Sequence, residues 1–77
     1  MRTRKPRPYF TLAVRIDGRW SPEFGDFDRE TVEAERQDYR DHDHKARDLK
    51  IITTAAGGRA VMAAIDKLNN AGARPLA

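Results

Sequence analysis

The feature that most constrains this fold is the alternating segment 9–16, YFTLAVRI, followed directly by Asp17-Gly18. Its even positions are all apolar, which predicts a strand with one face in a hydrophobic core. Asp and Gly both tolerate a positive φ, so Asp17-Gly18 is a strong signal for a tight hairpin turn. We therefore predict a β-hairpin whose second strand begins at Arg19.

The second strand carries a conflict of register around Trp20 and Phe24. A two-residue turn would pair Ile16 with Arg19 and point both aromatic side chains away from the core face. A longer loop or a β-bulge would shift the register by one residue and return both aromatics to that face. We favour this second arrangement. Pro22, which cannot donate a ladder hydrogen bond, also predicts an edge strand.

Three further elements follow the hairpin. Asp28 is a favourable N-cap for a polar helix over 29–41, and the narrow apolar stripe of that helix includes Val32. β-branched residues in 49–54 predict a third strand. Apolar residues at helical spacing predict a second helix over 59–70.

The order strand–strand–helix–strand–helix predicts a small α+β domain. A crossover helix between the second and third strands would lay the third strand beside the first, in a three-stranded sheet of order 2-1-3. We expect a two-layer sandwich with both helices on one face, so the other face would meet solvent or a partner. That other face would carry Tyr9, Thr11, Ala13, Arg15, Lys50 and Ile52.

Charge and length divide the 77-residue chain into three parts. We predict a flexible basic arm at 1–8, a single domain at 9–70 and a C-terminal tail at 71–77. The net charge of +3 is unevenly distributed, since residues 26–43 hold eight acidic residues against three arginines, a net charge of −5. The cations of the arm are Arg2, Arg4, Lys5 and Arg7.

Several functional classes lack the residues they need. There is no Cys for a disulfide or a thiolate metal site, and no apolar run approaches the roughly 20 residues of a membrane span. The Asp41–His44 run, D-H-D-H, resembles a metal site, but a single short loop would have to supply every ligand. We interpret it as a polar loop and predict no metal.

Enzymatic chemistry is also poorly supported. Ser21, the only serine, precedes Pro22 and has no His near it in the sequence. A small open hairpin provides no cleft to separate the pKa values of two carboxylates. Gly57-Gly58 could cradle a phosphate, but residues 53–59 match no phosphate-binding motif, so we expect these glycines to serve close packing. We therefore predict a non-enzymatic protein with no cofactor.

The first helix and the turn before it suggest a contact surface for a protein partner. Within 20–28 we expect Phe27 to pack on Val32 at the helix start, which leaves Glu23 and Asp26 without a structural role. A row of carboxylates can imitate a phosphate backbone and occupy a basic groove on another protein. A solvated helix face would show the same pattern. The predicted contact residues are Glu23, Asp26, Glu30, Glu33, Glu35, Asp38 and Asp41.

Two alternative functions are also compatible with the sequence. The basic arm could hold nucleic acid phosphates, which would make the chain a small nucleic-acid-associated regulator. The exposed sheet edge or face could instead make an oligomer, as in a small assembly protein.

The pattern W-x-x-E-F-G-D-x-D at 20–28, followed by KARDLKIITT at 45–54, resembles a group of small uncharacterised proteins of bacteriophages and prophages. The resemblance implies a phage accessory protein in the cytoplasm of a bacterial host, binding a host or phage protein. It also implies an inhibitor of a host defence system, such as an anti-CRISPR protein, as one such role. No catalytic residue follows from it.

Overall fold

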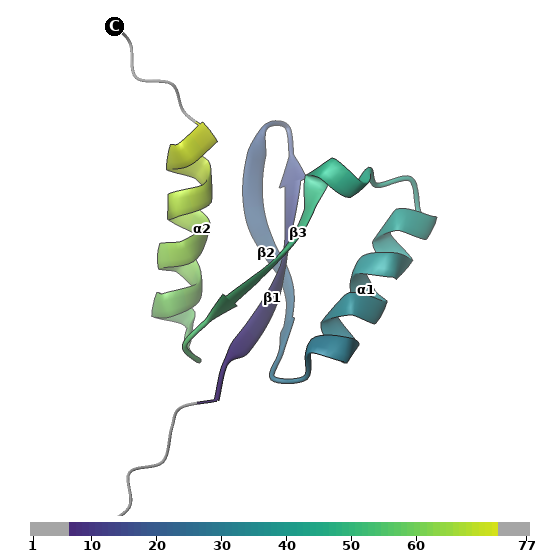
Figure 1. Ribbon diagram of the computed structural model, residues 1–77. Helices are drawn as coiled ribbons and strands as arrows, with labels where there is room; N and C mark the ends of the chain where they lie inside the picture. Colours follow the sequence, from purple (N-terminus) through teal and green to yellow (C-terminus); the bar gives the residue numbers. More distant parts are fainter. Residues whose placement is uncertain (1–6, 73–77) are drawn as a thin grey trace, which may run out of the picture.

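The computed structural model describes residues 7–72, which form one sheet with a helix on each side (Figure 1). The predicted elements are confirmed, and the second helix begins one residue earlier and ends two residues later than expected. The elements are β1 (Tyr9–Ile16), β2 (Arg19–Asp26), α1 (Arg29–Asp41), a short 3-10 helix (Ala46–Asp48), β3 (Leu49–Thr54) and α2 (Gly58–Gly72).

The predicted strand order is also confirmed. The sheet has the order β2-β1-β3, with β1 in the centre and antiparallel to both neighbours. β2 and β3 are therefore parallel to each other, and α1 connects them across β1.

The two helices cover opposite faces of the sheet (Figure 1). Leu12 and Val14 of β1 form a cluster with Val32 of α1, whereas Ala13 between them forms a second cluster with Val61 of α2. The expectation that both helices share one face is therefore wrong. The domain has three layers, helix, sheet and helix, with two separate hydrophobic cores.

The width of the sheet explains this arrangement. Three strands spaced about 4.8 Å apart make a surface about 14 Å wide, and a helix with its side chains is about 10 Å across. One helix therefore covers most of a face, and a second helix finds free apolar surface only on the other. As a result, residues 11–14 of β1 are all buried, and the face expected to meet solvent or a partner is the floor of the α2 core.

The hairpin turn has the tight form that Asp17-Gly18 favours. Asp17 and Gly18 have φ angles of 53° and 81°, and Ile16 lies opposite Arg19. The predicted β-bulge is also present: Ala13 lies opposite Pro22, but Leu12 lies opposite Phe24, so β2 contains one extra residue.

The position of the bulge separates Trp20 from Phe24. Two residues four positions apart share a face of a regular strand, but the extra residue lies between these two and turns one of them over. Trp20 packs against the α2 core and Phe24 against the α1 core. The expectation that both aromatics enter one core is therefore wrong, although each of them enters a core.

Candidate functional site

The first candidate site is the outer surface of α1. Val32 is fully buried, and Tyr39, two turns later on the same side, is half-buried against the same core. Because the helix is anchored along this one narrow stripe, the other side chains point sideways or outward. Of its five carboxylates, Glu35 is half-buried. The other four, Glu30, Glu33, Asp38 and Asp41, are exposed.

Helical spacing sorts the charges of α1 into three ridges. One flank carries the three arginines and Glu33, and Arg29 Nε donates to Glu33 Oε2 at 2.9 Å. The outermost ridge carries Glu30 near its start and Asp41 at its end. The opposite flank carries Glu35 and Asp38. The helix is therefore basic on one flank and acidic on the other, a division that the net charge alone does not reveal.

The β2 bulge adds a carboxylate to the acidic flank. Glu23 Oε2 accepts a hydrogen bond from Ser21 Oγ at 2.8 Å. Burial raises the pKa of the Tyr39 hydroxyl above its usual value of 10.0, and the charges of Glu23, Glu35 and Asp38 raise it further. Glu23 therefore lies within electrostatic reach of the acidic flank, and Tyr39 keeps its proton as a hydrogen-bond donor among these carboxylates.

Asp26, which the sequence left without a structural role, shapes the start of α1 instead. Its Oδ1 accepts a hydrogen bond from the backbone N–H of Asp28 at 2.7 Å. Asp28 is the N-cap, as predicted, and accepts from the N–H of Glu30 at 3.3 Å and from Thr31 Oγ1 at 2.8 Å. The bond from Glu30 satisfies one of the backbone N–H donors that the first helical turn leaves free.

A small hollow of about 280 Å³ lies beside the acidic flank at the end of α1, lined by Glu35, Asp38, Tyr39, His42 and His44. The His44 ring packs edge-on against Tyr39, with ring centroids 5.0 Å apart. The hydrogen bond between His42 Nδ1 and the carbonyl of Asp38, at 2.7 Å, raises the pKa of His42, and the Asp38 carboxylate raises it further. Within residues 7–72, no group of three or more His, Asp or Glu side chains could hold a metal ion.

A second candidate site lies on the other side of the sheet, where a groove of about 510 Å³ opens between β2 and the first turn of α2. Two exposed apolar side chains stand in its walls: Phe27, 40% exposed, and Met62, 47% exposed. Phe27 does not pack on Val32 as expected; its ring stands edge-on to Tyr9, with centroids 5.0 Å apart. Tyr9 in turn fills the space beside Gly25, where a Cβ would come within 2.8 Å of its ring.

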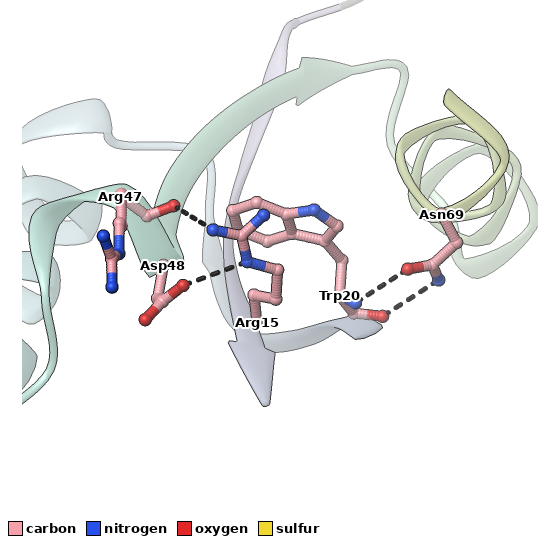
Figure 2. Close-up of polar contacts among 5 residues, drawn as sticks. All are labelled: Arg15, Trp20, Arg47, Asp48 and Asn69. Carbon is pink, nitrogen blue, oxygen red and sulfur yellow. Dashed lines mark hydrogen bonds and ion pairs between the residues drawn. The ribbon is translucent and has the colours of Figure 1, made fainter. Parts of the chain in front are cut away.

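The far end of α2 is fixed to β2 by Asn69 (Figure 2). The backbone N–H of Trp20 donates to Asn69 Oδ1 at 2.7 Å, and Asn69 Nδ2 donates to the carbonyl of Trp20 at 3.1 Å. The Arg15 guanidinium lies 5.2 Å from the centre of the Trp20 ring and its Nε donates to Asp48 Oδ1 at 3.0 Å. The two bonds from Asn69 cover the edge of β2 at Trp20. Arg15 connects the Trp20 ring to Asp48, in the short 3-10 helix before β3.

Only part of the predicted basic arm lies in the described region. Arg2, Arg4 and Lys5 lie outside the described residues. Arg7 is exposed, and its guanidinium lies 4.8 Å from the centre of the Phe27 ring.

No protein-family model matches this chain, and neither the curated proteins nor the solved structures include a significant match. Among residues 7–72, neither helix combines the length and apolar character required to cross a membrane.

The sequence identified the acidic helix but missed most of the groove. Tyr9, Phe27 and Met62 come from separate segments of the sequence and carry no motif. The one local signal is Gly57-Gly58 at the start of α2, for which we predicted a role in close packing. In the structure, the first turn of α2 borders the groove, and nothing lies within 4 Å of a Cβ built on either glycine, so the prediction of close packing is wrong.

Proposed function

We propose that this chain is a non-enzymatic binding protein that contacts a protein partner through the acidic flank and outer ridge of α1. The observation that carries the proposal is the narrow attachment of α1. Its apolar contact with the core is confined to the stripe of Val32 and Tyr39. Most of its charged side chains therefore point outward and are not needed for packing. A rigid row of carboxylates suits a basic groove on a partner.

The layout of the charges further defines the contact. Glu33 is paired with Arg29 on the basic flank, so it adds less to an attractive surface than Glu35 and Asp38 do. Glu23 extends the acidic flank from the helix to β2. With arginines on the opposite flank, a partner whose binding surface is basic would meet α1 in one preferred orientation, because the reversed orientation brings like charges together.

The proposed biological setting rests on the sequence pattern. The resemblance of residues 20–28 and 45–54 to phage and prophage proteins supports a phage accessory role in the cytoplasm of a bacterial host. The partner would then be a host or phage protein. A component of a host defence system with a basic nucleic-acid groove fits the charge of α1, which would make the chain an anti-CRISPR-like inhibitor.

The test is affinity capture from bacterial lysate with the wild-type chain and two double variants. Glu35→Gln with Asp38→Asn removes two charges from the acidic flank, and the matched control, Asp17→Asn with Asp66→Asn, removes two exposed charges elsewhere. Asn tolerates the positive φ of Asp17. We expect a basic protein to be captured by the wild type and the control but not by the first variant. Capture that survives in the first variant, or no specific capture at all, would contradict the proposal.

A nucleic-acid role has one observation in its favour. Arg7 lies over the exposed ring of Phe27, and proteins that bind single strands combine such cations with aromatic surfaces. Deleting residues 1–7 should then reduce the salt dependence of binding to a single-stranded oligonucleotide. An unchanged salt slope would exclude the arm from binding.

A further inference from the structure

The sheet has two edges, formed by β2 and β3, and the two edges differ. At β2, Asn69 binds both the N–H and the carbonyl of Trp20. Pro22 is the next residue of β2 that points the same way, and it has no N–H to offer a further strand. β3 is the strand nearest to the viewer in Figure 1, and neither helix crosses in front of it. Among residues 7–72, β3 is therefore the open edge of the sheet.

The bonds of Trp20 establish which backbone groups of the sheet point in which direction. Residues opposite each other in an antiparallel ladder exchange both of their backbone bonds or neither. Trp20 lies opposite Arg15 but binds Asn69, so the backbone groups of Arg15 point toward β3. This direction alternates along a strand. Ala13 and Thr11 therefore also point their backbone groups toward β3.

The same alternation identifies the free groups of β3. Lys50 and Ile52 lie opposite Ala13 and Thr11, so their backbone groups pair with β1. The N–H and C=O groups of the alternate residues, 51 and 53, then point away from β1. Within the described part of the chain, neither Ile51 nor Thr53 takes part in a backbone bond outside the sheet. The free edge of β3, residues 51–53, thus offers two donors and two acceptors in a row.

The basic flank of α1 lies beside this free edge. The acidic flank lies toward β2, since it is within electrostatic reach of Glu23, and β3 is on the other side of the sheet's centre. The right-handed crossover from β2 through α1 to β3 gives the same assignment. Arg36 and Arg40 are exposed, and in the region that the structure describes neither belongs to an ion pair. On the other face of the sheet, Lys50 of β3 is exposed too.

These cations decide between two occupants of a free strand edge. A second copy, paired antiparallel through β3, would turn the basic flank of one α1 toward the basic flank of the other, and like charges disfavour such a pair. A lysine on an edge strand also opposes self-pairing. An extended segment with acidic side chains would instead be attracted, because alternate side chains of a strand share one face and would meet the arginines.

We propose that the free edge of β3 binds an extended acidic segment of a partner protein by strand addition. The segment lies antiparallel to β3, and its backbone bonds to the N–H and C=O groups of Ile51 and Thr53. Its side chains on the α1 face are acidic and lie near Arg36 and Arg40. Those on the other face are apolar and pack beside the half-buried Ile52. This site is separate from the acidic flank and does not depend on the function proposed above.

The experiment is a titration of the ¹⁵N-labelled chain with three capped peptides, followed by amide NMR shifts and hydrogen exchange. The first peptide is acetyl-Glu-Val-Glu-Val-Glu-Val-amide, and the second has Lys in place of each Glu. The third carries an N-methyl group on each Glu, whose N–H groups would point at β3. We expect the first peptide to slow exchange at the N–H groups of Ile51 and Thr53 about tenfold at saturation. The other two should bind more weakly by about tenfold or more.

Two pairs of variants separate binding from folding. Thr53→Pro removes an outward N–H without removing a bond to β1, and Thr53→Val keeps that N–H. Affinity for the first peptide should fall about tenfold in the proline variant and stay within about twofold in the valine variant. Arg36→Glu reverses a charge of the basic flank, whereas Arg19→Glu reverses one beside the hairpin turn, and both arginines are exposed. Arg36→Glu alone should weaken binding, by about fivefold.

Several results would overturn the proposal. Equal affinity for the glutamate and lysine peptides would show that the cations do not select the segment. Undiminished binding of the N-methylated peptide would show that its backbone does not pair with β3. A dimer in sedimentation, with slow exchange at Ile51 and Thr53 in the chain alone, would assign the free edge to a second copy. Tighter binding of a single-stranded oligonucleotide that is lost in Arg36→Glu would assign the basic flank to nucleic acid. Absence of any shift with the glutamate peptide at millimolar concentration would also contradict the proposal.

Discussion

The two faces of the sheet differ in the side chains that β1 provides and in the helix that covers them. On the α1 face, β1 provides the bulky side chains Leu12 and Val14, and the helix adds little beyond Val32 and Tyr39. On the α2 face, the buried residue of β1 in the cluster is the small Ala13, and the helix provides three apolar side chains, Val61, Ile65 and Leu68. Where the central strand provides bulky side chains, the helix that covers it can be polar, and where the central strand provides a small one, the helix contributes more apolar side chains.

This difference has consequences for function. α1 is free to carry charge, because so little of it is needed for packing. α2 packs on the sheet along one apolar side, through Val61, Ile65 and Leu68. We therefore expect charge recognition on the side of the molecule that α1 covers.

The largest effect is expected from a charge placed between β1 and α2. Ala13 is fully buried, so Ala13→Lys should lower the free energy of unfolding by more than about 3 kcal/mol. A small domain is stable by about 5 kcal/mol or a little more, so this variant should keep about 2 kcal/mol or less and unfold at a much lower urea concentration. Thr53→Lys on the exposed part of β3 is the control and should unfold almost as the wild type does. Circular dichroism during urea titration measures both.

A pair of deletions tests whether the two cores are independent. Val32→Ala should cost about 2 kcal/mol and Ile65→Val about 1 kcal/mol, because both side chains are almost fully buried. They belong to separate clusters on opposite faces, so the double variant should lose the sum of the two within about 0.5 kcal/mol. A larger coupling energy in urea unfolding would show that the helices share one core.

A smaller effect is expected at the contact that fixes α2 to β2. Asn69→Ala removes two hydrogen bonds to the backbone of Trp20 and should cost about 1–2 kcal/mol. Asn70→Ala, at the exposed neighbouring position, is the matched control and should change stability little. Amide hydrogen exchange at Trp20 should accelerate in the first variant alone; equal exchange in both would remove Asn69 from this role.

The smallest effect concerns pH at the end of α1. The pKa of His42 is raised above its ordinary value of 6.5, first by its hydrogen bond to the Asp38 carbonyl and then by the Asp38 charge. Protonated His42 therefore stabilises the folded state below about pH 6.5, and this contribution disappears as the pH rises through the folded-state pKa. Asp38→Asn should lower that pKa in an NMR titration, whereas Asp66→Asn should not.

Local features of the fold could be predicted from the sequence, but the side of the sheet taken by α2 could not. Alternation, turn residues and the cap at Asp28 depend on neighbours in the chain, and the sequence therefore locates them well. Alternation shows which residues share a face, but not which face a later helix covers. Ala13 and Thr11 suit either water or a tight core, so they gave no signal. The position of the bulge, which decides where Trp20 points, depends on long-range packing.

The candidate sites follow the same division. Four of the five acidic residues of α1 are exposed and Glu35 is half-buried, because helical spacing determines their side of the helix. The sequence alone could not remove Asp26 from the predicted contact residues, since its bond to the N–H of Asp28 depends on the local turn geometry. The groove could not be predicted because three distant segments form it.

The most direct test of the two-sided arrangement is the set of methyl contacts made by Ala13. A methyl NOESY spectrum should show cross-peaks from Ala13 to Val61 and Ile65 of α2, and from Leu12 to Val32 of α1. If the Ala13 methyl shows no contact with α2, and the α2 methyls contact Leu12 instead, then both helices lie on one face and the two-sided arrangement is wrong.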